Sequence, residues 1–362
     1  MNANYASDRQ TYHHLNGMKG IACFFVLVGH YLGIYKYSQS FIPSICCFDI
    51  INDSHFAIFL DEGYWLYLFF VISGYLVSRS NIYNIKELLC RIVIRFFRLA
   101  CPILFSHFII YFIYRTVGFH NGETTTLFQC EWFQHIFYTR DFTIKDVLIS
   151  PFSVLIFGNS DMNKPYWVLQ MMFFSSIVIY LIVFCFMKWD FWQREIFVCV
   201  LLIAVISLSF IFPIISAHLI GMLAAFYEKN DFNCQSSYLF WVIITAMLIV
   251  ILPDKILASV SFAILVVLTP RVKVINDFFC RKLCRFLGSI SWEIYSFHWP
   301  IVCSFGALWL VNESNRIGLA EAYLCGFFIA VVIIVTLSWC FNKTLGKLAA
   351  ILIRKLYVFL HC

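Results

Sequence analysis

The hydrophobic positions of this chain gather into long apolar blocks that short polar segments separate. A helix needs about 20 apolar residues to cross roughly 30 Å of hydrocarbon, and most blocks approach that length. The pattern therefore predicts an all-α, polytopic bundle of about ten transmembrane helices. The predicted spans are residues 18–37, 58–78, 99–117, 166–187, 196–213, 215–228, 237–253, 256–270, 288–311 and 320–341.

Two breaks between neighbouring blocks are predicted to be tight turns. One lies at Phe212-Pro213 and the other at Pro253-Asp254-Lys255. Proline ends a helix and charged residues prefer water, so each break separates two spans.

Composition excludes a water-soluble globule. Of 362 residues, 62% are hydrophobic and 13% are charged, which leaves too little polar surface to cover a soluble fold. The formal net charge is +6, but the lysines and arginines lie in short clusters and form no basic face, so we expect no nucleic-acid partner. The 15 cysteines are scattered and indicate no disulfide framework.

The basic residues indicate how the chain is oriented. With the N-terminus in the cytoplasm, 19 of the 26 Lys and Arg residues fall on the inner side, as the positive-inside rule requires. Both termini are therefore predicted to be cytoplasmic. No cleavage site follows the first apolar block, so no signal peptide is expected. Residues 345–362 have the pattern of an amphipathic cytoplasmic tail behind a transmembrane domain of residues 1–344.

Chemistry is expected where ionisable residues interrupt the apolar blocks, because a charge in hydrocarbon is costly. In the first span, His30 lies eleven residues beyond Lys19, which places both on nearly the same helix face about 16 Å apart. Imidazole titrates near neutrality, so His30 has the chemistry of a general base near mid-membrane. The alternative is a histidine that only packs against a neighbouring helix.

A second cluster consists of Arg91, Arg95 and Arg98. Spacings of four and three residues place the three guanidinium groups on one helix face, which suits forked binding of phosphate oxygens. With Lys86 nearby, this face is a candidate seat for the phosphates of coenzyme A. Ordinary anchoring of a cytoplasmic loop is the alternative. The motifs of nucleoside triphosphatases and dinucleotide-binding folds are missing from the sequence.

The predicted ninth span carries a second histidine. His298 lies ten residues beyond Gly288, and His30 lies ten residues beyond Gly20. The two imidazoles are therefore expected at a similar depth, where they could meet in one cavity.

Three neighbours of this histidine carry further expectations. Ser291 shares its helix face, whereas Glu293 lies about 140° round the helix and is expected to pair with another group. Pro300 is expected to bend the helix and leave a backbone carbonyl free to line a polar site.

These landmarks, in this order, resemble the integral membrane acyltransferase 3 family over nearly the whole chain. The family's opening Asp-Gly-Leu-Arg-Gly followed by His is similar to Asn16-Gly17-Met18-Lys19-Gly20 and His30. Its second-helix signature is similar to residues 69–76, and its basic cluster before a proline is similar to residues 95–102. Its late Leu-Gly, Ser, Tyr and His-x-Pro pattern resembles residues 287–300.

The resemblance implies a membrane-bound acyltransferase that moves an acyl group, usually acetyl, from a cytoplasmic coenzyme A thioester to a sugar hydroxyl. It implies an acceptor such as lipopolysaccharide O-antigen or capsule, and a place in a bacterial inner membrane. Acyl-CoA is then a donor substrate, with no permanently bound cofactor and no metal. The candidate residues are His30 and His298 for catalysis; Lys19, Arg91, Arg95 and Arg98 for donor binding; and Ser73, Gly74, Trp167, Gln170 and Glu293 for substrate or structural support.

The sequence departs from the family pattern at three positions. Asn16 and Lys19 stand where the family usually has Asp and Arg, and Lys keeps the charge without the planar fork. Met172 stands where the family's Trp-x-Leu-x-x-Glu segment has its Glu. If that acid orients a histidine or the substrate, Gln170 or Glu293 would have to replace it.

Two other classes of protein compete with the enzyme. A glycan or lipid transporter would be expected to carry internal repeats with broken helices in matching positions, and none is found. A non-catalytic, acyltransferase-like binding protein would keep the fold without the acid, as Met172 suggests.

Among the remaining residues, His218 is interpreted as a packing residue, and Cys280 and Cys284 lack the second ligand pair that a zinc site needs.

Overall fold

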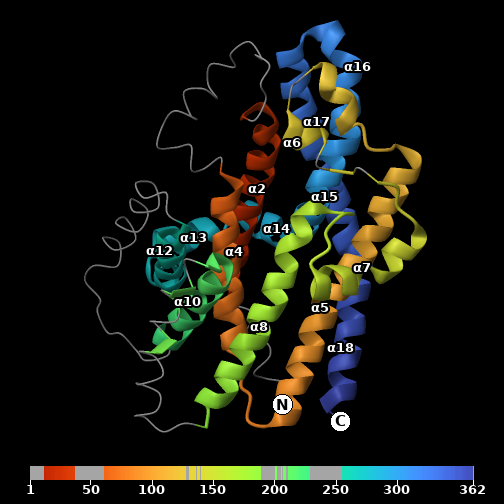
Figure 1. The fold of residues 1–362 in the computed structure, drawn as a ribbon. Helices are drawn as coiled ribbons and strands as arrows, with labels where there is room; N and C mark the ends of the chain where they lie inside the picture. The colour runs from red at the N-terminus through yellow and green to blue at the C-terminus, as the bar shows by residue number, and fades with distance from the viewer. Residues whose placement is uncertain are drawn as a thin grey trace.

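The computed structural model is built from helices joined by turns (Figure 1). It describes residues 12–36, 61–127, 130–135, 137–138, 140–188, 200–201, 205, 207–208, 211–228 and 255–361. These residues contain no strand, which confirms the predicted all-α class.

The helices follow the order of the predicted spans, with additional short helices between them. The α-helices are α2 His13–Lys36, α4 Glu62–Ser78, α5 Ile85–Thr116, α6 Glu131–Gln134, α7 Ile144–Phe157, α8 Trp167–Phe186, α10 Pro213–Glu228, α12 Lys255–Leu268, α13 Lys273–Phe279, α14 Lys282–Ser289, α15 Ser291–Ile301, α16 Ala307–Ile317, α17 Leu319–Phe341 and α18 Lys347–His361. The 3₁₀ helices are η2 Asn121–Thr126, η3 Lys164–Tyr166 and η4 Thr269–Arg271, and the π-helical turns are η5 Val302–Gly306 and η6 Asn342–Gly346.

Within the described residues, four helical segments are long and apolar enough to cross a bilayer: His13–Ile34, Lys164–Phe186, Ser291–Ile317 and Leu319–Leu360. A fifth is formed if Lys255–Arg271 and Lys273–Phe279, which meet at an angle of 103°, count as one broken span. The chain is therefore an integral membrane protein. The predicted spans 196–213 and 237–253 lie largely or wholly outside the described residues, and the number of ten stays a prediction.

Helix α5 begins earlier than the apolar pattern predicts. The predicted span was 99–117, whereas the helix starts at Ile85, where the side chain of Asn84 accepts a hydrogen bond from the Glu87 backbone N–H at 2.9 Å. This N-cap satisfies a donor that the first helical turn leaves free, so the helix can begin in a polar stretch. All three arginines of the cluster consequently lie inside α5.

The predicted ninth span, 288–311, is also divided differently. The chain breaks at Ile290, so Gly288 lies at the end of α14 and the membrane-capable helix begins at Ser291. Pro300 lies inside α15, and the π-helical turn η5 follows it directly. Proline lacks the N–H of a regular helix, which explains why the helical register changes at this point.

The tail after residue 344 is helical and is continuous with the helix before it. Helix α17 continues through η6 into α18, giving one helical run from Leu319 to Leu360. Helix α18 lies along α5, and the Cys90 thiol donates a hydrogen bond to the Leu360 carbonyl at 3.4 Å. Its cytoplasmic position stays a prediction.

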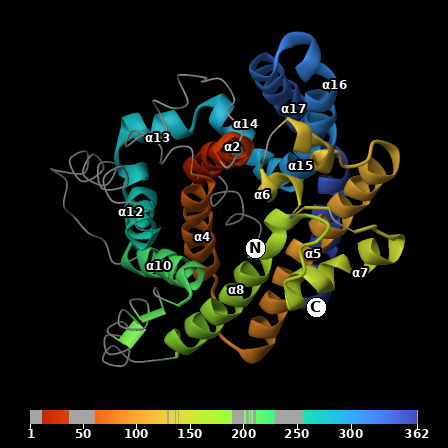
Figure 2. The same cartoon turned by 45° about the horizontal axis from the view of Figure 1, so that its top comes forward.

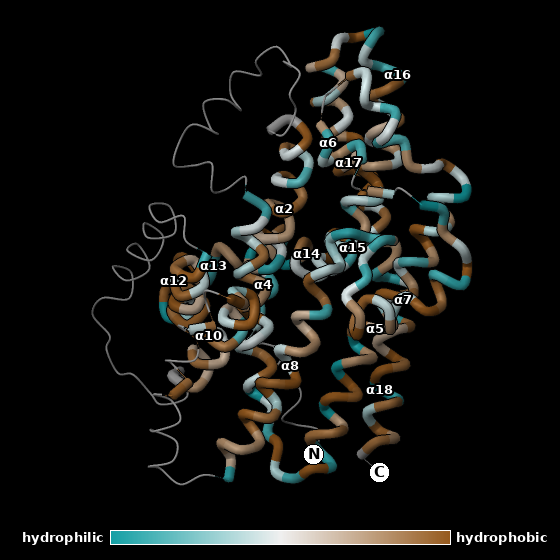
Figure 3. The backbone as a smooth tube through the Cα atoms, viewed as in Figure 1, coloured by the Kyte–Doolittle hydropathy of each residue, from teal (hydrophilic) through white to brown (hydrophobic). Residues whose placement is uncertain are grey.

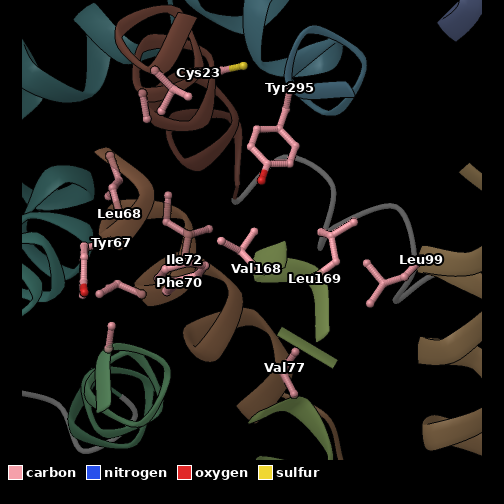
Figure 4. Packing of buried hydrophobic residues seen from close by; sticks show 14 of the residues in the cluster. Cys23, Tyr67, Leu68, Phe70, Ile72, Val77, Leu99, Val168, Leu169 and Tyr295 are labelled. Atoms are coloured by element: carbon pink, nitrogen blue, oxygen red, sulfur yellow. The ribbon is translucent and has the colours of Figure 1, made fainter. Parts of the chain in front are cut away.

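Helices α2 and α4 lie at the centre of the bundle. Figure 2 shows α10, α12 and α13 on one side of them and α5, α7, α8 and α18 on the other. The hydropathy colouring of Figure 3 places hydrophobic residues along much of the lower lengths of α5, α8 and α18, as helices that face lipid require. Figure 4 shows the core between α4 and α8, where Ile72, Val168 and Leu169 lie close together.

Two glycine contacts set how closely the central helices approach. A Cβ atom added to Gly74 of α4 would collide with the His218 carbonyl of α10, and one added to Gly20 of α2 would meet the Gly288 backbone nitrogen of α14. Small residues allow helix backbones to approach within membrane bundles. Gly74 therefore forms a backbone contact with α10.

Helix α7 lies outside the predicted spans and begins with a capping box. The Thr143 hydroxyl accepts from the Asp146 backbone N–H, and the Asp146 carboxylate accepts from the Thr143 backbone N–H at 2.8 Å and from its hydroxyl at 2.7 Å. These hydrogen bonds stabilise the ionised carboxyl group and lower the pKa of Asp146, with the nearby Arg140 adding to the effect.

Candidate functional site

A cavity of about 330 Å³ lies among α2, α4, α5, α8, α15 and α18. Four cationic side chains line it: Lys19 of α2 and Arg91, Arg95 and Arg98 of α5. No Asp or Glu is among the described residues that line it. We call this space the cationic cavity. It brings together all the residues that the sequence suggested for donor binding.

Arg95 is fixed in the wall of the cationic cavity by two hydroxyl groups. Its Nε donates to the Ser176 Oγ of α8 at 3.0 Å, and its Nη2 donates to the Ser73 Oγ of α4 at 3.0 Å. Ser176 in turn donates to the Met172 carbonyl at 2.6 Å. Hydroxyl groups orient a guanidinium group without neutralising it, so the positive charge stays available for an anion.

The other cations are also uncompensated. In the part of the chain that the structure describes, none of the four forms an ion pair with a carboxylate. The Nε atom of Arg91 is buried and lacks a hydrogen-bond partner. Buried polar groups are almost always paired, so this donor indicates a ligand or water in the space beside it.

His30 and His298 lie side by side, with 4.9 Å between their ring centroids. In His30, Nδ1 lies 2.9 Å from the Val26 carbonyl; in His298, Nδ1 lies 2.8 Å from the Tyr295 carbonyl. A carbonyl only accepts, so each Nδ1 carries the proton and each Nε2 keeps a lone pair. We call these two residues the histidine pair. Within it, His298 is buried, with no hydrogen-bond partner at Nε2, and His30 is partly exposed.

The glycine contacts explain why the two rings meet. Gly20 and Gly288 touch through their backbones, and a Cβ atom on Gly288 would collide with the Asn16 carbonyl. From this contact α2 continues without a break to His30, whereas the other chain segment breaks at Ile290 and α15 then carries it from Ser291 to His298. The contact therefore fixes where both segments start, and α15 brings His298 beside His30.

Tyr295 connects the histidine pair with the cationic cavity. Its side chain lines the cavity, and its ring centroid lies 5.8 Å from that of His298. The hydroxyl donates to the Pro165 carbonyl. Figure 4 shows the Tyr295 ring pointing from α15 toward Val168 at the start of α8. The histidine pair itself does not line the cavity, so Tyr295 separates the two regions.

The irregular backbone at Pro300 supports a polar network beside His298. Because Pro300 has no N–H, the Ser296 carbonyl four residues earlier lacks its helical partner, and Asn163 donates to it at 2.8 Å. The Tyr166 hydroxyl donates to Ser296 Oγ at 2.7 Å and lies 2.8 Å from Ser106 Oγ. The carbonyl expected to be free is thus used to anchor the segment that leads into α8.

The proposed substitutes for the family's acid lie elsewhere. Glu293 accepts a hydrogen bond from the Asn342 side chain at 2.8 Å, which identifies the partner expected for it. Gln170 donates to the Ile156 carbonyl of α7 at 2.8 Å. Met172, in contrast, lines the cationic cavity. An acid at this position would therefore face the cations of the cavity.

The remaining candidates have structural positions. Trp167 is 48% exposed at the start of α8 and does not line the cavity. His218 is buried; its Nδ1 donates to the Ile214 carbonyl at 3.0 Å, and its ring stacks on Phe70 with centroids 5.2 Å apart. Ser291 lines the cavity and donates to the Gly288 carbonyl at 3.0 Å.

The sequence did not indicate Ser176, Tyr166 or Tyr357 as residues of the site. It also did not indicate that Tyr295 lies between the cationic cavity and the histidine pair. Ser176 lies one helical turn beyond Met172, so a small polar residue at that spacing inside an apolar span was an available signal. Tyr357 also lines the cavity, although it belongs to the tail beyond residue 344. No sequence pattern relates that tail to α5.

The described helices thus form a site with four cations around a cavity on one side of Tyr295 and two imidazoles on the other. A family model described as an acyltransferase domain matches residues 12–343. The chain belongs to the acyltransferase 3 family, as the motifs suggested. Neither the search of curated proteins nor the search of solved structures gave a match.

Proposed function

We propose that this protein transfers an acyl group, most simply acetyl, from cytoplasmic acyl-CoA to a hydroxyl of a cell-surface glycan such as O-antigen or capsule. The observation that carries the proposal is the cationic cavity, in which four cations face a space that no carboxylate of the described residues lines. Coenzyme A carries several phosphates, and guanidinium groups bind phosphate in forked pairs. With both termini in the cytoplasm, α5 would present this cavity to the cytoplasmic donor in a bacterial inner membrane.

The histidine pair supplies the base. Nε2 of His30 takes the proton of the acceptor hydroxyl, whose oxygen attacks the thioester carbonyl carbon. A carbon–oxygen bond forms, the carbon–sulfur bond breaks, and the proton passes to the departing thiolate. The Nδ1–H bond to Val26 holds the ring in the tautomer that this step requires.

The test is acyl transfer in membranes from labelled acetyl-CoA to the glycan of the source cell. We expect the wild-type chain to label the glycan, and His30→Ala and the Arg95→Ala/Arg98→Ala double variant to lose the label at equal expression. Parallel reactions with longer acyl-CoA donors define the acyl group. Wild-type membranes that label no glycan with any donor would overturn the proposal.

A non-catalytic binding protein is the second candidate. Met172 favours it, because neither Gln170 nor Glu293 has its hydrogen bond directed at the histidine pair. Such a protein would bind coenzyme A in the cationic cavity without consuming acetyl-CoA. Donor binding measured beside label transfer therefore separates the two functions.

A further inference from the structure

The C-terminal helix α18 contributes to the cationic cavity although it lies beyond the residues that match the family. The match ends at residue 343, whereas Tyr357 of α18 lines the cavity together with Arg91. The tail therefore adds a side chain to a site whose other walls come from the family's own helices.

The position of Tyr357 along α5 follows from one hydrogen bond. Cys90 of α5 donates to the carbonyl of Leu360, so the last turn of α18 lies beside the first turns of α5. Tyr357 lies three residues before Leu360, about 4.5 Å along the axis. The two helices run in opposite directions (Figure 1), which places Tyr357 level with the turn between Arg91 and Arg95.

The tryptophan and tyrosine residues of the cavity divide between its two ends. Trp292 and Tyr295 belong to the end near the histidine pair. Tyr180 of α8 lies one turn beyond Ser176, the partner of Arg95, and is only 6% exposed. Tyr357 is partly exposed. The arginine end thus has a buried aromatic wall on α8 and a partly exposed ring on α18.

We propose that Tyr357 is a stacking platform for the purine ring of a nucleotide-containing thioester donor. The inference rests on the proposed function and deepens it, because it assigns the nucleotide end of the donor. Arg95, Arg98 and Lys19 then hold phosphate groups, and the thioester arm extends toward Tyr295 and the histidine pair. A flat aromatic ring beside Arg91 suits a base, which stacks on aromatic and guanidinium faces alike.

The test compares three ligands on the purified full-length protein: coenzyme A, adenosine 3′,5′-bisphosphate and 4′-phosphopantetheine. Loss of one base–aromatic contact predicts a roughly 5- to 150-fold weaker affinity. Tyr357→Ala should weaken binding of the first two ligands by this factor and leave phosphopantetheine unchanged. Tyr357→Phe keeps the ring and should bind all three ligands as the wild type does.

Phe359→Ala is the matched control, since Phe359 lies on the same helix, is 78% exposed and does not line the cavity. It should bind all three ligands normally. If Tyr357→Ala lost affinity for coenzyme A and for phosphopantetheine equally, or lost affinity for neither, the stacking role alone would be overturned. A wild-type protein that binds neither coenzyme A nor the bisphosphate would overturn the proposed function as well.

Discussion

The cationic cavity and the histidine pair are neighbours with opposite chemistry. The cavity gathers four cations, one of which, Arg95, donates to two hydroxyl groups. The histidine pair instead lies among aromatic side chains, and the ring centroids of His30 and Trp299 are 5.6 Å apart. The cavity is suited to holding a charged ligand, and the pair is suited to moving a proton. The proposed function therefore assigns binding and chemistry to separate residues, and Tyr295 lies between them.

This separation implies that the two regions can be damaged independently. A change in the histidine pair should lower turnover and leave donor affinity intact, and a change in the cationic cavity should do the reverse. Enzymes that use the same residues for binding and chemistry would lose both together.

After His30 itself, the largest effect is expected at His298. Replacing it with Gln removes the imidazole next to His30 and should lower turnover about 100-fold, the size of effect that misplacing a reacting group produces. Affinity for coenzyme A should not change. Steady-state transfer and equilibrium binding on the same preparation measure the two quantities.

His218→Gln is the control for that change, because His218 is also buried and also donates Nδ1–H to a backbone carbonyl of its own helix. It should keep most of the activity. If both variants lose turnover equally, the histidine pair has no special role.

Arg95→Ala tests the opposite half of the comparison. Hydrogen bonds to charged groups contribute about 1.5–3 kcal/mol, so affinity for acetyl-CoA should fall roughly 10- to 100-fold. Turnover at saturating donor should stay near that of the wild type, because Arg95 contacts Ser73 and Ser176 rather than the histidines. Titration of membranes with labelled acetyl-CoA measures the affinity.

Arg115→Ala provides the matched control, since Arg115 lies in the last turn of the same helix and does not line the cavity. Its affinity should be unchanged. A turnover defect in Arg95→Ala that saturating donor does not restore would show that the two regions are one functional unit.

Gly74→Ala tests the contact that holds the wall of the cavity in place. The added methyl group collides with the backbone of His218, so α4 and α10 must separate, and the expected loss of stability is about 1–3 kcal/mol. Gly306→Ala is the comparison, because the nearest atom to its new Cβ is 3.6 Å away. Thermal unfolding in detergent should show a lower midpoint for Gly74→Ala alone; equal midpoints would refute the close contact.

Much of the arrangement of this site was predictable, because it depends on the helical periodicity of the sequence and on the positions of Gly20 and Gly288. The helical repeat placed Arg91, Arg95 and Arg98 on one face, and the equal residue counts from Gly20 and Gly288 predicted neighbouring histidines, although the break at Ile290 interrupts the second count. The family motifs identified the class. The partners of Arg95 and the position of Tyr357 could not be predicted, because they depend on which helices pack against α5.

The fold was predicted less fully than the site. Hydropathy finds apolar lengths, so it located the cores of α2, α4, α8 and α17. It missed the polar beginning of α5, which depends on the Asn84 cap, and the break at Ile290 before α15. It also gave no sign that α17 continues into α18, because the charged residues between them resemble a helix end.

Met172→Glu sharpens the comparison by placing the family's acid in this chain. The new carboxylate would lie one helical turn from Ser176 and near Arg95. It would compete with the phosphates of the donor for the positive charge of Arg95. The expected rise in the dissociation constant for acetyl-CoA is about tenfold, or roughly 1.4 kcal/mol. Met172→Gln adds the same bulk without charge and should bind as the wild type does. A large gain in turnover instead would show that this position acts on the histidine pair.

The smallest effect is expected at Thr143, which belongs to neither region. Thr143→Ala removes the N-cap of α7 and should lower stability by about 1 kcal/mol, with donor binding and turnover unchanged. Because the folded-state pKa of Asp146 is lowered, its stabilising contribution is present at neutral pH and lost as the pH falls through that pKa. The difference in unfolding midpoint between wild type and variant should therefore shrink in acid. A constant difference across pH would mean that the Asp146 carboxylate plays no part in the cap, and a loss of donor affinity would mean that α7 acts on the cationic cavity.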